Sequence, residues 1–161
     1  MPRLGRTMAG AVALALLAGP AAAASWGLEL HQGIESVGMR NAGGELFSFV
    51  CNYGDDAHPG LLGVEFELKG KLTASTGMVA VSSTLASGKP GEQMAFEAAL
   101  EDEQDVVGVS FYSFTHDEAV ALIALARVAR SITVSVPALG RTAVFVPTGG
   151  RASWGKIDCK F

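Results

Sequence analysis

Runs in which apolar and polar residues alternate constrain the fold of this chain more than any other feature. In the clearest run, residues 62–69, Leu, Val, Phe and Leu alternate with Gly, Glu, Glu and Lys. Residues 26–31 and 96–101 show the same alternation. Because a period of two places apolar side chains on one face of a strand, each run predicts a half-buried strand.

Further segments extend this predicted sheet. Residues 45–51 (ELFSFVC) are apolar on both faces and predict a central strand. Residues 69–71 and 102–105 predict tight turns, and residues 87–92 (SGKPGE) predict a loop. The short spacing between strands and turns is typical of a meandering antiparallel sheet. The remaining predicted strands cover residues 78–82, 106–114, 131–136 and 142–146.

One segment predicts a helix. Thr115 and Glu118 have the spacing of a capping box, in which each side chain bonds to the other residue's backbone N–H group. Arg127 and Arg130 stand near the other end, where the helix dipole favours cations. Together with the Ala- and Leu-rich sequence between them, these signals predict one main helix over about residues 117–130.

Apolar residues occur on more than one side of this predicted helix. Leu122, Ile123 and Ala126 form one apolar face, and residues 120, 125 and 128 make other sides apolar too, which predicts a well-buried helix. Residues 151–158 predict a further short C-terminal helix. The expected fold class is therefore β-rich α+β, as an antiparallel β-sandwich or partly open barrel with one main helix.

The N-terminus has the features of an export signal. Arg3 and Arg6 precede a short apolar run, residues 8–19, which Pro20 ends. This run is shorter than the roughly 20 apolar residues of a spanning helix. The alanines at 22–24 suit a signal peptidase, so we expect residues 1–24 to be a signal peptide. Cleavage between Ala24 and Ser25 would leave one β-rich domain, residues 25–161, in the periplasm or outside the cell.

The predicted mature chain is acidic. Without Arg3 and Arg6, ten of the twelve basic residues remain against sixteen acidic ones, a net charge of −6. An acidic surface argues against nucleic acid or anionic lipid as the main partner. The charge is uneven, with −11 over residues 25–118 and +5 over residues 119–161. Either this forms a two-faced surface that steers a charged partner, or the two segments pack together and neutralise each other, which we favour.

Cys51 and Cys159 are the only cysteines. An even number in an exported chain predicts one structural disulfide, because neither a Cys-x-x-Cys motif nor a neighbouring His indicates redox or zinc chemistry. In the chain-entropy model, closing so long a loop is worth about 4–5 kcal/mol.

Two sets of residues are candidates for binding. The first is the loop that contains Tyr53, Asp55, Asp56 and His58, whose Asp-Asp-x-His sequence suits cation binding or acid–base chemistry. The alternative for this loop is a solvated turn without a ligand. The second set is basic and consists of Arg127, Arg130, Arg141 and Arg151.

The chain contains no recognisable catalytic or cofactor motif. The three histidines, His31, His58 and His116, do not have the spacing of metal ligands, so we expect no metal site and no cofactor. Trp26 and Trp154 lie at the two ends of the mature domain. Tryptophan is enriched in binding hot spots, but in a small β domain we expect it in the core or over a sheet end.

The C-terminal third resembles a group of exported proteins. An Ala- and Leu-rich helix (residues 119–130) leads into ITVSV (132–136), a glycine turn, VFVP (144–147) and a short segment that ends at Cys159. This order is similar to that of small exported proteobacterial single-disulfide proteins of the invasion-associated locus B type. The resemblance implies a β-sandwich-like domain with no known chemistry, and it transfers no catalytic residue.

These features together predict a non-enzymatic binding or accessory module of the cell envelope with a protein partner. A periplasmic hydrolase with a dispersed site is one alternative, and it requires His58 or His116 to converge with a carboxylate and a serine in a pocket. A second alternative comes from Phe49-x-Cys51, which is similar to the aromatic-x-Cys strands of small periplasmic lysozyme inhibitors. Such an inhibitor would present a protruding loop that enters a cleft.

Overall fold

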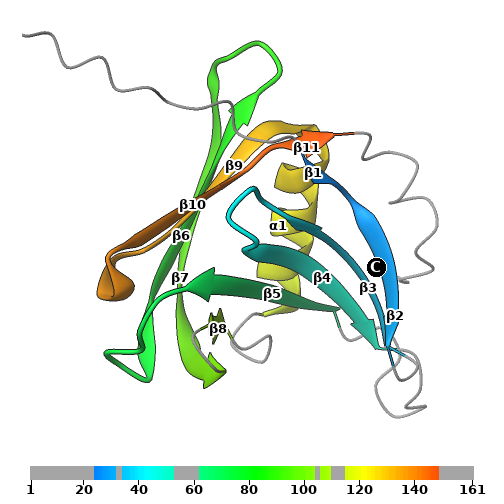
Figure 1. The fold of residues 1–161 in the computed structure, drawn as a ribbon. Helices are drawn as coiled ribbons and strands as arrows, with labels where there is room; N and C mark the ends of the chain where they lie inside the picture. The colour runs from blue at the N-terminus through cyan, green and yellow to red at the C-terminus, as the bar shows by residue number, and fades with distance from the viewer. Residues whose placement is uncertain (1–23, 32–33, 53–61, 104–105, 110–114, 149–161) are drawn as a thin grey trace, which may run out of the picture.

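A computed structural model describes residues 24–31, 34–52, 62–103, 106–109 and 115–148 (Figure 1). Strands dominate the described chain, with one main helix, α1 (His116–Val128), and a single 3₁₀ turn, η2 (Pro137–Leu139). The predicted β-rich α+β class is therefore confirmed. The strands are β1 (Ala24–Ser25), β2 (Gly27–His31), β3 (Ile34–Arg40), β4 (Leu46–Asn52), β5 (Leu62–Lys69), β6 (Thr76–Leu85), β7 (Pro90–Glu103), β8 (Val106–Val109), β9 (Ala129–Val136), β10 (Arg141–Phe145) and β11 (Pro147–Thr148).

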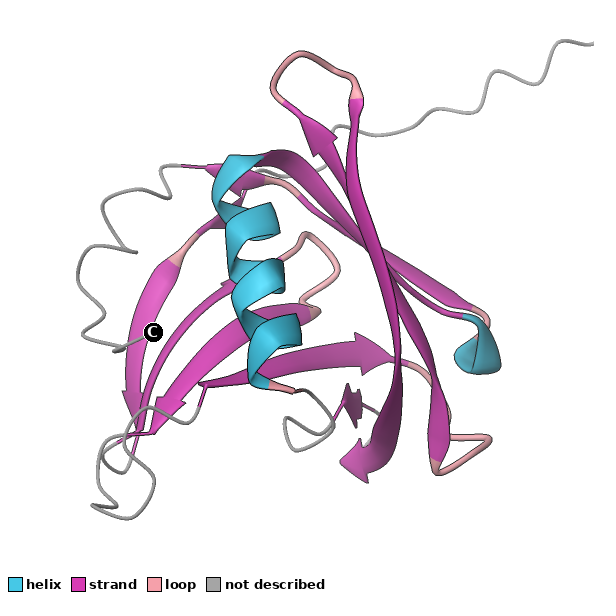
Figure 2. Ribbon diagram, turned by 180° about the vertical axis from the view of Figure 1, so that it is seen from behind, coloured by secondary structure: helices cyan, strands magenta, loops and turns pink. Residues whose placement is uncertain are grey.

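Nine of these strands form one antiparallel sheet in the order β10-β9-β6-β7-β8-β5-β4-β3-β2. The sheet is not closed into a barrel, because β10 and β2 are its two ends. It curves strongly, and α1 lies along the opening between its two halves (Figures 1 and 2). The helix contacts β5 from one half and both β6 and β9 from the other. Strands β1 and β11 form a separate parallel pair, in which Ala24 opposes Pro147.

The expected meander holds only for part of the chain. Strands β2 to β5 follow each other in sheet order, as do β6 to β8, but β5 pairs with β8 instead of β6. The predicted tight turn at 69–71 is therefore wrong, since Lys69 ends β5 and the chain crosses over before β6 begins at Thr76. A hydrogen bond from Thr73 Oγ1 to Ala138 O, 2.7 Å long, fixes this crossover on η2.

Strand β3 was not among the predicted strands, because its alternation is short, with only Val37 and Met39 between Ser36, Gly38 and Arg40. The structure gives a physical reason for this glycine. A Cβ atom at position 38 would lie 2.8 Å from the Cβ of Ser48 on the neighbouring strand β4. A side chain at position 38 would therefore push β3 away from β4 at this point.

The core is organised around the ring of Phe47. Its centroid lies 4.7 Å from that of Phe66, 4.9 Å from that of Phe49, 5.7 Å from that of Trp26 and 5.8 Å from that of Phe145. Phe145 belongs to β10 at one end of the sheet, whereas Phe47 belongs to β4 near the other. Their contact joins the two halves of the curved sheet. Trp26 is buried, as expected for a core residue, and Trp154 lies outside the described residues.

The predicted capping box of α1 is confirmed. The Thr115 side chain accepts from Glu118 N, and the Glu118 carboxylate accepts from Thr115 N at 2.8 Å. The helix ends at Val128 instead of residue 130, because Ala129 already belongs to β9. The predicted burial of several helix sides is only partly right. Residues 119, 122, 123, 125 and 126 are buried, but Val120 and Val128 are exposed, since the sheet covers one side of the helix only.

Replacing Phe47 by Ala tests the role of the aromatic cluster. We expect F47A to lower the free energy of unfolding by about 3–5 kcal/mol, since the central ring is fully buried. V144A serves as the control because Val144 is 44% exposed on β10, and we expect its effect to stay within about 0.5 kcal/mol. Urea denaturation measures both values. If F47A does not fold, F47L gives the same test with a smaller loss of stability. Equal changes in the free energy of unfolding for the Phe47 variant and for V144A would contradict the packing described.

Candidate functional site

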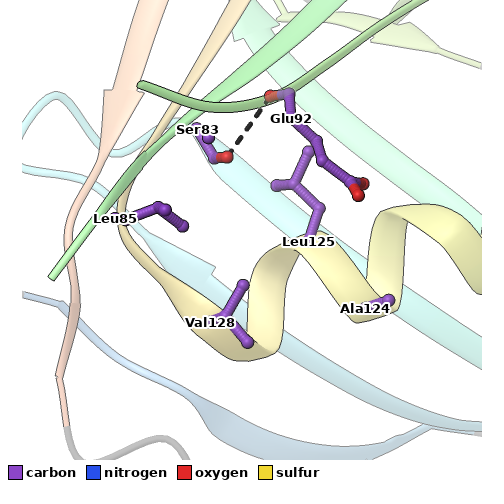
Figure 3. Close-up of a pocket in the computed structure, with 7 residues that line it drawn as sticks. Ser83, Leu85, Glu92, Ala124, Leu125 and Val128 are labelled. Atoms are coloured by element: carbon purple, nitrogen blue, oxygen red, sulfur yellow. Dashed lines mark hydrogen bonds between the residues drawn. The ribbon is translucent and has the colours of Figure 1, made fainter. Parts of the chain in front are cut away.

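A groove of about 410 Å³ lies between the β6–β7 hairpin and α1 (Figure 3). Its volume lies within the range of about 300–1,000 Å³ that is typical of ligand sites. We call it the β7–α1 groove. Its lining residues are Ser83, Leu85, Gly91, Glu92, Ala124, Leu125 and Val128.

A β-bulge shapes the hairpin side of the groove. Ser82 opposes Gln93 and Thr84 opposes Pro90, so the single residue Ser83 opposes both Gly91 and Glu92. The buried Ser83 hydroxyl donates to the backbone oxygen of Glu92 at 3.3 Å. A Cβ atom at position 91 would overlap Ser83 Oγ, so any other residue at this position would force the hydroxyl to move.

Exposed apolar residues of α1 form the other side of the groove. Val120, Ala124 and Val128 follow each other at intervals of four and therefore share one helix face. All three are exposed, with Val128 at 61% and Val120 at 39%. The buried Leu125 lies beside this stripe and completes the helix side of the groove. The described chain thus leaves apolar helix surface in contact with water next to a hollow, which is a common property of binding sites.

Charged residues stand at the rim of the groove. Glu92 is exposed, and its side chain reaches from β7 toward α1 (Figure 3). Arg127 precedes Val128 on the helix. Arg130 occupies a second bulge, because Leu85 opposes Ala129 while Thr84 opposes Ser131. The groove therefore carries a carboxylate on the hairpin side and has arginines near the end of α1.

The structure separates the predicted basic set. Arg127 and Arg130 lie near the groove, whereas Arg141 opposes Val136 at the far end of β9. Val136 lies six positions along β9 from Arg130, a span of about 20 Å. Arg151 lies outside the described residues. The described members of the set thus do not form a single patch.

Arg141 takes part in an ion pair that the sequence did not reveal. Its Nη2 atom lies 2.8 Å from Oε1 of Glu45, a carboxylate that is 6% exposed. Glu45 Oε2 also accepts from Asn41 Nδ2 at 2.8 Å. Glu45 belongs to the acidic part of the chain and Arg141 to the basic part. At this position the two parts neutralise each other, as favoured from the sequence, although Glu45 had been expected to begin an apolar strand.

The predicted loop with Tyr53, Asp55, Asp56 and His58 lies outside the described residues, so its role stays a prediction. The same holds for the short C-terminal helix and for the disulfide, because Cys51 lies in β4 but Cys159 is outside the described chain. Among residues that the structure describes, no group of three or more His, Cys, Asp and Glu side chains has a metal-binding arrangement.

Among the residues that the structure describes, groups suited to nucleophilic catalysis do not converge on the groove. Ser83 and Glu92 line it, but the Ser83 hydroxyl is bonded to a backbone oxygen. His116 begins α1, and the groove meets the helix eight to twelve residues later, about 12–18 Å along its axis. The arrangement suits the binding of an apolar group better than acid–base chemistry.

None of the lining residues of the groove was among the binding candidates from the sequence. Residues 87–92 were expected to be a loop, but a hydrogen bond from Leu85 N to Lys89 O closes the turn and β7 already starts at Pro90. The bulge depends on pairing between two strands and has no local signature. Val120 and Val128 were visible as apolar residues in the sequence, but they were interpreted as buried, and Ala124 was not singled out.

Comparisons of the chain with family models, with curated proteins and with solved structures gave no match. The resemblance to the invasion-associated locus B type therefore stays a prediction from the sequence. Within the described ranges, no helix has the length and apolar character needed to cross a membrane.

The contact between Ser83 and Gly91 can be tested by a double-mutant cycle. We expect G91A to lower the free energy of unfolding by about 1–3 kcal/mol, because the new methyl group meets Ser83 Oγ. In an S83A background the same change should cost clearly less, since the obstructing oxygen is gone. Thermal and urea unfolding of the four proteins measure the cycle. If the changes in the free energy of unfolding caused by G91A and S83A are additive in the double variant, the two residues do not touch.

Proposed function

We propose that this chain is an exported, non-enzymatic binding module whose β7–α1 groove takes an apolar segment of a protein partner in the cell envelope. The single observation that carries this proposal is the exposed stripe of Val120, Ala124 and Val128 beside a groove of about 410 Å³. Burying such apolar surface contributes about 25 cal/mol per Å², so the stripe is a source of binding free energy. The export-type N-terminus, residues 1–24, supports the proposed location.

The lysozyme-inhibitor alternative has one observation in its favour. The tip of the β6–β7 hairpin, residues 86–89, is exposed and projects beyond the rest of the sheet (Figures 1 and 2). A projecting tip suits a contact in which a loop enters a cleft. Lys89 is the charged residue of this tip and distinguishes such a contact from binding in the groove.

Val128→Glu tests the groove directly. We expect the neutral apolar dye N-phenyl-1-naphthylamine to bind the native protein in a saturable way and V128E at least tenfold more weakly. The reason is that a carboxylate in the groove must lose water when the dye enters. V144E is the matched control, since it places the same charge on an exposed valine of β10. Fluorescence titration measures the affinities, and identical titrations for all three proteins would contradict a binding groove.

Capture from an envelope extract then distinguishes the candidate surfaces. The groove proposal predicts that V128E loses a partner that the native protein and V144E retain. Loss of the partner in the D55A/D56A/H58A variant alone would assign binding to the predicted loop instead. Loss in K89A alone, together with inhibition of lysozyme by the native protein, would favour the inhibitor alternative.

A further inference from the structure

Among the described strands, the backbone beside the groove has a neighbour on one side only. β7 pairs with β6 from Pro90 to Ala99, but β8 covers only residues 100–103 on its other side. Among the described strands, residues 90–94 therefore have no neighbour on the side away from β6. Such an edge presents unpaired N–H and C=O groups, which form a template for another extended chain.

The register limits how far β8 itself could cover this edge. Val109 opposes Leu100, and in the same register Phe114 would oppose Ala95. The next residue, Thr115, is already the N-cap of α1. Residues 90–94 thus lie beyond the reach of β8, and these are the residues that border the groove.

The free edge and the groove belong to one site. Gly91 and Glu92 contribute both to the edge of β7 and to the groove lining, while Ala124 and Val128 of α1 face them across the hollow. A strand added to β7 would lie about 4.7–4.9 Å from it, between the hairpin and the helix. Its alternate side chains would enter the apolar groove.

We infer that the occupant of the β7–α1 groove is an extended segment of a partner protein, which adds as a strand to residues 91–94 of β7. This inference rests on the function proposed above and specifies the partner. The segment carries apolar residues at alternate positions, and a Lys or Arg beside them pairs with Glu92. The exposed Glu92 carboxylate gives this charge preference, since it stands at the edge itself.

Two features of β7 favour a short peptide over a second copy of this chain. Pro90 has no N–H group, so the ladder of an added strand ends there. The bulge at Gly91 and Glu92 increases the local twist, which opposes the growth of a long, flat intermolecular sheet.

The test uses a seven-residue probe peptide with Val, Lys and Val at positions two, four and six and Thr elsewhere. Two matched peptides are N-methylated, one at the odd and one at the even amides. In strand addition only one set of amides faces β7, so one methylated peptide should bind at least tenfold more weakly while the other retains the parent affinity. Calorimetry and displacement of the naphthylamine dye measure binding.

The charge preference is tested by exchanging the peptide Lys for Glu. We expect this exchange to weaken binding at least fivefold to the native protein and clearly less to Glu92→Gln. An equal loss with both proteins would overturn the pairing with Glu92.

The outcomes separate this inference from the proposed function. If V128E reduces dye binding but both methylated peptides bind like the parent, the groove stands and strand addition is overturned. Strand addition is also overturned if no probe peptide binds at millimolar concentration. If the native protein self-associates in sedimentation and the peptide does not compete, the occupant is a second copy. Unchanged dye binding by V128E would remove the proposed function itself.

Discussion

The contact between Phe47 and Phe145 is the interaction on which the rest of the structure depends. These rings come from β4 and β10, which lie near opposite ends of a nine-stranded sheet, and their centroids are 5.8 Å apart. The contact keeps the sheet curved without hydrogen bonds between its two ends. A curved, unclosed sheet leaves an opening, and α1 fills it by contacting both halves. The helix is buried on one side for this reason, and its other side remains available.

The groove follows from the same geometry. Because the described part of β8 pairs with only the last part of β7, the first part of β7 has no described neighbour on this side and forms an edge next to α1. Bulges opposite Ser83 and at Arg130 shape the hairpin at this point, where a regular ladder would continue. The site is thus a place at which pairing stops and a helix runs alongside, and this combination suits an added strand.

Much of the fold was predictable because its signals are local. The capping box of Thr115 and Glu118 and the alternation over residues 62–69 depend on neighbours in the sequence, and both predictions are confirmed. The crossover after Lys69 was not predictable, because turn residues do not specify which strand becomes the neighbour. Glu45 was assigned to an apolar strand, since its partner Arg141 lies 96 residues away.

The candidate site was less predictable than the fold. The bulge at Gly91 and Glu92 depends on register, and the exposure of Val128 depends on which side of α1 the sheet covers. Neither property can be derived from the local sequence. The loop with Asp55, Asp56 and His58 had the more recognisable chemistry, and it lies outside the described residues.

The central claim is that β7 presents a free edge beside α1, and amide hydrogen exchange in the ligand-free protein tests it most directly. NMR follows each amide separately. The account predicts that residues 80–82 of β6, which pair with β7 on one side and β9 on the other, exchange slowly throughout. Within residues 91–94 at least one amide should exchange at nearly the rate of an unstructured peptide. Slow exchange of every amide in residues 91–94, at the level of β6, would mean that the edge is covered and would contradict the account.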